Sequence, residues 1–141
     1  MQIMAHSVNL AGGDAGVQCS GIFTPTELSA IGNAGEITVN ANMLRLADGA
    51  VVNSRTLNAS NGGNIAINAR TLEAVDGGQV LTTASSGGPA GKLQLNVSES
   101  IRLSGSEQTF GDRLARFGQN LGNNPSSSWR MFSNALERLN G

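Results

Sequence analysis

Hydrophobic and polar residues alternate in three separate stretches of the chain. Alternation with a period of two residues is typical of a β-strand that buries one face. Corresponding residues of the three stretches are 28 positions apart, and each stretch begins two residues after a glycine. The stretches are Ile37-Thr38-Val39-Asn40, Ile65-Ala66-Ile67-Asn68 and Leu93-Gln94-Leu95-Asn96. They predict three similar strands, one in each copy of a repeat.

A turn marker keeps the same period, because Asp48-Gly49, Asp76-Gly77 and Ser104-Gly105 recur at the same spacing. Leu44 and Leu46 alternate before the first of these turns, after a break at Asn42-Met43. Another short strand begins after the turn and runs toward Thr56. Three short strands per repeat form one coil of a parallel β-solenoid, and a fixed period of this length marks stacked repeats. We therefore predict an all-β parallel β-helix of about three to four coils.

Stacking would place identical or similar side chains above one another, with neighbouring strands about 4.8 Å apart. Ile37, Ile65 and Leu93 would then share one buried column, since a single coil has too few apolar residues to bury its own inner face. The residues Asn40, Asn68 and Asn96 would form a ladder of hydrogen-bonded amides along the stack. The alternative is that each asparagine caps its own turn.

Two departures from the period are expected. Val8 to Gly13 match Leu44 to Gly49 at an offset of 36 positions. The N-terminus is therefore interpreted as the trailing half of an earlier repeat, with an eight-residue insertion near residues 19–30 that contains Pro25. In the third copy, Ile101 and Leu103 come one residue late. Because a one-residue slip exchanges the faces of a strand, a bulge is predicted near Ser98 to Ser100.

The repeat pattern ends after Gly105, and a helical spacing of apolar residues takes its place. Residues 1–106 are accordingly assigned to β-helix repeats and residues 107–141 to a short helical C-terminal tail. This tail would cover the exposed last coil, as terminal repeats commonly do. Docking of a partner helix or a membrane surface is the alternative. The tail carries the aromatic residues Phe110, Phe117, Trp129 and Phe132.

The repeats resemble those of filamentous-haemagglutinin-like proteins, of the form found in large cyanobacterial exoproteins. The segments that carry the resemblance are Gly32-Asn33-Ala34-Gly35-Glu36-Ile37-Thr38-Val39, Asn61-Gly62-Gly63-Asn64-Ile65-Ala66-Ile67, Ala90-Gly91-Lys92-Leu93-Gln94-Leu95, Leu44-Arg45-Leu46-Ala47-Asp48-Gly49-Ala50 and Val75-Asp76-Gly77-Gly78-Gln79-Val80. It covers about residues 8 to 106 and implies a right-handed parallel β-helix shaft, export by two-partner secretion and adhesion at a cell surface. The implied location is secreted or on the outer cell surface, and the implied partners are glycans or cell-surface components. The membrane would be met only through a separate transporter.

Composition narrows these expectations. The formal net charge is −1, with nine Lys and Arg among 141 residues, so no nucleic-acid partner is expected, since such a groove needs clustered cations. The single Cys19 excludes an internal disulfide. A cationic start followed by an apolar run is missing, so a signal peptide is not predicted in this chain. The missing signal peptide and the tail outside the repeat pattern favour a shaft fragment, a degenerate copy or one end of such a protein. A fragment would have the rest of a longer solenoid as its partner.

No catalytic, cofactor-binding or metal-binding residues are predicted. Asp48 and Asp76 would stack one coil apart and offer oxygens to a hard cation such as calcium, but Asp-Gly is also ordinary turn chemistry. Glu36, Glu73 and Glu99 fall at different phases of the repeat. We therefore predict a non-enzymatic structural and adhesive module. The alternative is a carbohydrate-binding or carbohydrate-active β-helix, lyase-like or esterase-like, or its inactive remnant.

Hydroxyl side chains occur in and after the short strands that follow the Asp-Gly turns. Thr56, Thr82, Thr83 and the turn Ser85-Ser86-Gly87-Gly88 would form a polar flank able to contact glycans through several weak hydrogen bonds. A solvated face without a ligand is the other interpretation. Asn58-Ala59-Ser60 and Asn96-Val97-Ser98 match the glycosylation acceptor sequence.

Overall fold

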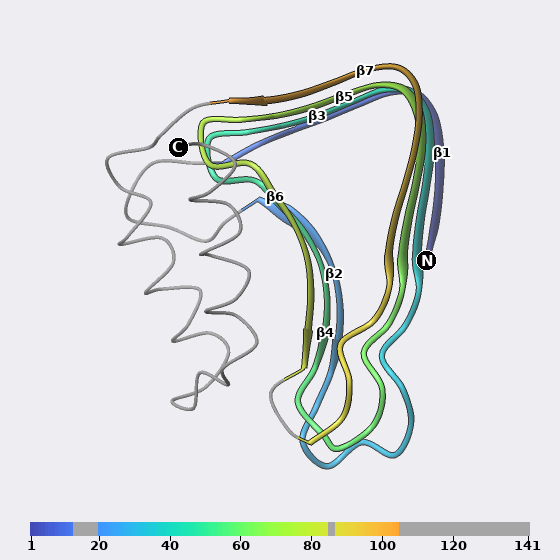
Figure 1. Ribbon diagram of the computed structural model, residues 1–141. Coiled ribbons are helices and arrows are strands. Elements are labelled where there is room, and N and C mark those ends of the chain that lie inside the picture. Colours follow the sequence, from blue (N-terminus) through green and yellow to red (C-terminus); the bar gives the residue numbers. More distant parts are fainter. Residues whose placement is uncertain (13–19, 85–86, 105–141) are drawn as a thin grey trace.

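The computed structural model describes residues 1–12, 20–84 and 87–104. These residues form seven β-strands and no helix, which confirms the predicted all-β class. Four long strands form the first sheet and three short strands form the second (Figure 1). The first sheet has the order β1 (Gln2–Ala11), β3 (Ile37–Ala47), β5 (Ile65–Val75) and β7 (Leu93–Ser104). The second has the order β2 (Gly21–Thr26), β4 (Val51–Thr56) and β6 (Gln79–Ala84).

Every pair of neighbouring strands is parallel, and the predicted period fixes the register. Ile37 pairs with Ile65, and Ile65 pairs with Leu93, so each step is one period of the sequence repeat. The second sheet keeps the same step, because Val51 pairs with Gln79. Each strand therefore pairs with the strand that follows two elements later, so successive repeats lie side by side along both sheets.

The long strands bend in the middle (Figure 1). The paired register runs from Ile37 to Ala41, omits Asn42, and resumes at Met43. We call the residues before the bend the first arm and those after it the second arm. The predicted break at Asn42-Met43 is this bend. The second sheet faces the inner side of the angle between the two arms.

The core lies between the two arms and the second sheet. It is built from aliphatic side chains of the middle repeats that have no exposed surface: Ile37, Val39, Leu44, Leu46, Val52, Ile65 and Ile67. Burial of each such side chain contributes about 1.5–3 kcal/mol. Val52 is the residue of the second sheet among them. All three sides of a repeat therefore contribute to one core.

The turns between the second arm and the second sheet use left-handed backbone. Asp48 and Gly49 have φ angles of 51° and 73°, and Asp76 has 48° and Gly77 has 81°. Positive φ at both central residues is the pattern of a type I′ turn, for which Asp-Gly is a favoured sequence. The backbone N–H of Ala50 donates to the carbonyl of Ala47 at 3.0 Å and closes the first turn. Turn geometry thus explains the recurring Asp-Gly.

The glycine that recurs before each long strand has a steric reason. A Cβ atom on Gly63 would lie 2.1 Å from the carbonyl oxygen of Gly35, and one on Gly91 would lie 2.0 Å from that of Gly63. Real Cβ atoms do not approach so closely, so the backbones of successive repeats touch at this position. On Gly35 the nearest atom, in Thr24, would be 3.5 Å away, an ordinary contact.

The prediction that the insertion lies near residues 19–30 is wrong, because strand β2 lies within that range. The predicted offset of 36 positions is confirmed between β1 and β3, where Gln2 pairs with Thr38. Gly21, however, pairs with Val51, so the offset between β2 and β4 is six positions smaller. Six of the eight extra residues therefore lie between β1 and β2, and the other two lie between β2 and β3. Pro25, expected in a loop, is tolerated in β2 because β2 is an edge strand among the described strands.

The predicted bulge in the third copy is confirmed. Ala69 pairs with Val97 but Thr71 pairs with Ser100, so the offset grows by one residue between them. The new offset persists to the end of β7, where Ser104 pairs with Val75 rather than with Asp76. Ser104 is consequently not the equivalent of Asp76, contrary to the turn marker read from the sequence. Residues 107–141, the predicted helical tail, lie outside the described residues.

The glycine contacts give a matched pair of substitutions. We expect Gly63→Ala to destabilise the fold by about 2 kcal/mol, because the new methyl group must push two backbones apart. Gly35→Ala has room for its methyl group and should change the free energy of unfolding by less than about 1 kcal/mol. Urea denaturation followed by circular dichroism measures both. Equal losses for the two variants would contradict the steric explanation.

Candidate functional site

The outer face of the first arm carries a ladder of asparagine amides. The Nδ2 atom of Asn68 donates to Oδ1 of Asn40 at 2.8 Å, and Nδ2 of Asn96 donates to Oδ1 of Asn68 at 2.7 Å. The three residues are in register on β3, β5 and β7. The predicted ladder is confirmed. It joins three repeats by side-chain hydrogen bonds in addition to those of the backbone.

The ladder does not reach β1. Met4 is the residue of β1 that pairs with Asn40, and its side chain is 76% exposed. At the other end, Nε2 of Gln94 donates to Oδ1 of Asn96 at 3.3 Å. The described ladder thus ends at a methionine on one side and at a glutamine amide on the other.

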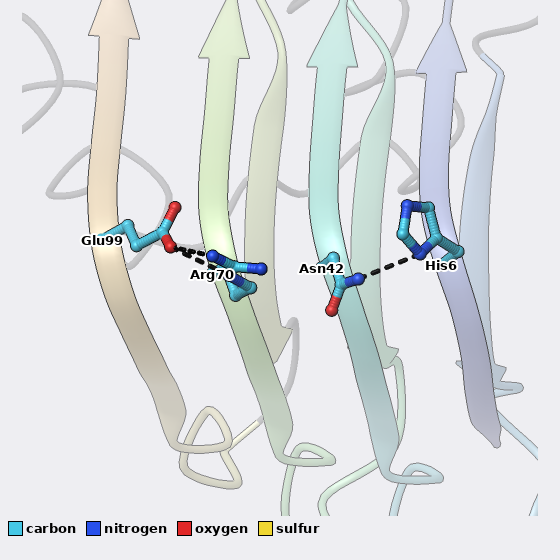
Figure 2. A network of polar contacts seen from close by, with 4 residues as sticks. All are labelled: His6, Asn42, Arg70 and Glu99. Atoms are coloured by element: carbon cyan, nitrogen blue, oxygen red, sulfur yellow. Dashed lines mark hydrogen bonds and ion pairs between the residues drawn. The ribbon is translucent and has the colours of Figure 1, made fainter.

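A column of polar side chains follows the bend of the first sheet, one from each of its four strands (Figure 2). We call it the corner column; its members are His6, Asn42, Arg70 and Glu99. Asn42 Nδ2 lies 3.0 Å from His6 Nδ1, and Arg70 Nε donates to Glu99 Oε1 at 2.9 Å. The Arg70 and Glu99 side chains are 62% and 48% exposed, so their ion pair contributes little to stability. The column is a solvated polar edge.

Sequence reasoning did not find the corner column. Its residues occupy the positions at which the backbone register is interrupted. The bulge lies at the same place, because the extra residue of β7 falls opposite Arg70 and brings Glu99 to it. The one available signal was the recurrence of a polar residue directly after an alanine, at His6, Asn42 and Arg70.

A second charged pair lies on the outer face of the second arm. Arg45 Nε is 3.4 Å from Glu73 Oε2, and both side chains are about one-third exposed. Arg102 pairs with Glu73 in the register of the next strand. Positive, negative and positive side chains therefore alternate across β3, β5 and β7. Like the corner column, this row links neighbouring repeats. Among the described residues, it does not bring several carboxylates together in one place.

The inner face of the second sheet holds hydroxyl groups that bond to the main chain. Ser54 Oγ and Thr24 Oγ1 donate to the carbonyl of Gly35 at 3.0 and 2.9 Å. Thr82 Oγ1 donates to the carbonyl of Gly91 at 2.8 Å, and Thr56 is fully buried and donates to Asn58. The predicted hydroxyl flank is therefore wrong for Thr56 and Thr82, because their hydroxyls face inward. Ser85 and Ser86 lie outside the described residues.

Both asparagines that match the glycosylation acceptor sequence are engaged in the fold. Asn58 is buried, and its Nδ2 atom donates to the carbonyls of Ala30 and Gly32 at 2.7 and 3.1 Å. Asn96 is the last rung of the ladder. A glycan on Nδ2 of Asn58 would displace both of these hydrogen bonds, so this position does not suit modification of the folded chain.

The outer face of the second sheet is poorly hydrated. Val51, Asn53 and Leu81 alternate with inward-facing residues, yet they are 2%, 1% and 6% exposed. Within the described residues, neither polar side-chain atom of Asn53 has a hydrogen-bond partner. Burial lowers the pKa of the Arg55 guanidinium, and the nearby charge of Glu27 opposes this shift. The polar surface that the described strands present to solvent is consequently that of the first sheet.

The acidic residues do not assemble a reaction centre in the described part of the chain. Glu36 accepts a hydrogen bond from Nδ2 of Asn64 at 3.0 Å, while Glu73 and Glu99 pair with different arginines at other places. No group of three His, Cys, Asp or Glu side chains that could hold a metal ion occurs within residues 1–12, 20–84 and 87–104. Asp48 and Asp76 occupy turn positions whose positive φ accounts for them without a cation.

No family model, no curated protein and no solved structure matches this chain. The resemblance to haemagglutinin-like repeats therefore continues to rest on the sequence motifs. Among the residues that the structure describes, no helix is long and apolar enough to cross a membrane.

Removal of the central rung tests the ladder. Asn68→Ala deletes both amide hydrogen bonds and leaves an amide unpaired on each side, so we expect a loss of about 1–2 kcal/mol. Asn96→Ala deletes one hydrogen bond of the ladder and the longer one from Gln94, both at an exposed position, and should cost less than about 1 kcal/mol. Both are measured by urea denaturation. The ladder would have no stabilising role if Asn68→Ala were as stable as the unmodified chain.

Extension of the ladder is the complementary test. Met4→Asn places an amide opposite Asn40, whose Nδ2 atom can donate to the new side-chain oxygen. We expect a gain of about 0.5–1.5 kcal/mol in the free energy of unfolding. Met4→Leu is the control, since it changes the side chain without adding an amide. Stability is measured by thermal and urea unfolding. The expectation is contradicted if Met4→Leu is as stable as Met4→Asn or more stable.

Proposed function

We propose that this chain is a non-enzymatic structural and adhesive module, a shaft segment of the filamentous-haemagglutinin-like type. It forms a right-handed parallel β-helix and is secreted or displayed on the outer cell surface through a separate transporter. If the chain is a fragment, its partner is the rest of a longer solenoid. The observation that carries the proposal is the parallel pairing of successive repeats in both sheets, which continues on both sides of the bend and of the bulge. Such stacking suits a rod that extends by addition of repeats.

The layout of one repeat supports a β-helix. A repeat contributes two arms and one short strand, which enclose a common core on three sides. The turns recur at equivalent positions with the same backbone geometry. Side chains of like kind follow one another along the stack, as the asparagine ladder does. Each of these features is repeated from coil to coil in a β-helix.

Adhesion is assigned to the outer face of the first sheet. This face presents amides and charged side chains in rows, from the ladder through the corner column to Arg45 and Glu73. Rows of spaced hydrogen-bonding groups can hold an extended glycan through many weak contacts, whose combined strength exceeds that of any one. The dispersed acids favour binding over cleavage, since hydrolysis or elimination needs a convergent acid and base.

Glycan binding is tested with a matched pair of variants. We expect the full chain to be retained on a panel of immobilised neutral and sialylated oligosaccharides. The double variant Asn42→Ala, Arg70→Ala should reduce retention about tenfold or more, because two hydrogen-bonding side chains are lost. Asn61→Ala, which alters an exposed asparagine in the connection between β4 and β5, should leave retention unchanged.

Three results would overturn parts of the proposal. The absence of retention on any glycan would remove the adhesive role. Release of shortened or unsaturated sugars, detected by mass spectrometry, would show an enzyme instead. A far-ultraviolet circular dichroism spectrum without β-structure, or without a cooperative melt, would remove the β-helix.

A further inference from the structure

The first sheet ends in two different open edges. Its order places β1 at one end and β7 at the other, and among the described strands each has a neighbour on one side only. The edges of β1 and β7 therefore present backbone N–H and C=O groups without a strand partner. Because all strands of the sheet are parallel, a translation along the stack brings the β1 edge of one copy onto the β7 edge of another. The backbone pattern then continues as it does within the sheet.

Three apolar columns of the core are open at the β7 end. They run through Ile3, Val39, Ile67 and Leu95, through Val8, Leu44, Leu72 and Ile101, and through Leu10, Leu46, Ala74 and Leu103. Val39 and Ile67 have no exposed surface, whereas Leu95 is 39% exposed and Ile101 and Leu103 are each 50% exposed. Residues that would be buried by one more strand are thus in contact with water.

The two ends match each other in sequence. If β1 of a second copy took the place of the next strand on β7, Ile3 would lie on Leu95, Val8 on Ile101 and Leu10 on Leu103. Each column would then continue with an aliphatic side chain. The bulge does not prevent this register, since β5 also lacks the extra residue and pairs with β7 on both sides of it.

The edges lack the usual protection against such contacts. Strand β1 contains no proline and no Asp, Glu, Lys or Arg, the residues with which natural proteins commonly guard an edge. Strand β7 contains Glu99 and Arg102, and in the proposed register these would face the uncharged side chains of β1 near His6 and Asn9. No two like-charged side chains of the two strands are brought together.

We propose that copies of this chain associate head to tail, with β1 of one copy pairing in parallel with β7 of the next. The first sheet carries the contact, because the layer of β7 has no second-sheet strand among the described residues. Since the two surfaces differ, the association does not close on itself and produces open-ended chains of subunits. The partner of both edges is thus a second copy of the same polypeptide.

Two blocked variants of the full chain test the proposal. Leu95→Lys with Ile101→Lys blocks the β7 edge, and Ile3→Lys with Val8→Lys blocks the β1 edge. Sedimentation velocity of the unmodified chain should show a series of oligomers that grows with concentration. Each blocked variant alone should be monomeric. Their equimolar mixture should form a one-to-one dimer and nothing larger, because only one open pair of edges remains.

Other outcomes overturn the proposal. An unmodified chain that stays monomeric at every concentration would mean that another segment covers one of the edges. Dimers of the β1-blocked variant alone would indicate a β7-to-β7 contact instead. A monomeric mixture of two folded variants would exclude the contact altogether.

Disulfide trapping provides a second measurement that does not need the blocked variants to fold. In a Cys19→Ser background, Asn9→Cys with Arg102→Cys places thiols at positions that the proposed register brings together between copies. Within one copy these positions lie three strands apart in the sheet, too far for a disulfide. Oxidation should give a ladder of cross-linked species. Asn9→Cys with Asn96→Cys, out of register, should give at least tenfold less, and equal yields would overturn the assigned register.

Discussion

The structure depends on parallel backbone pairing at a constant step along the chain. Once Ile37 pairs with Ile65 and Ile65 with Leu93, the residues of the first arm meet their equivalents in the next repeat, and the second arm pairs in the same order after the bend. Aliphatic residues then fall into buried columns, asparagines into a hydrogen-bonded ladder, and glycines into the places where backbones touch. None of these arrangements needs a separate explanation, because a shift of register by one residue would disrupt all of them together.

The bend of the first sheet is where this constraint is relaxed. The residues at the bend have no backbone partner in register, so polar side chains occupy it and bond along the stack. The extra residue of β7 is inserted at the same point. An insertion within an arm would break the backbone hydrogen bonds between neighbouring strands. At the bend, the backbone pairing is already interrupted, so an insertion there breaks none of them. Both arms of β7 therefore keep parallel pairing with β5 despite the change in offset.

Much of this fold could be predicted from the sequence, because a repeated pattern states the same structure several times. The strands, the Asp-Gly turns, the ladder and the bulge all followed from the period and the phase of the apolar residues. Strand β2 was missed because Pro25 and its polar neighbours resemble a loop, and only its place at the edge of the sheet permits them. The inward hydroxyls of Ser54 and Thr82 were missed because their partners are main-chain carbonyls in the connections before β3 and β7. The corner column was missed because the bend that gathers it is a property of the folded sheet.

The asparagine ladder also gives the stack a direction. Each amide donates toward β1 and accepts from the side of β7, so the side-chain dipoles of Asn40, Asn68 and Asn96 point the same way. Hydrogen bonds arranged in such a chain polarise one another. The row accordingly has a partly positive N–H end beside β1 and a partly negative oxygen end at β7, where Gln94 donates to it. A rod built from these repeats is thus electrically polar along its length, although its side chains carry almost no net charge.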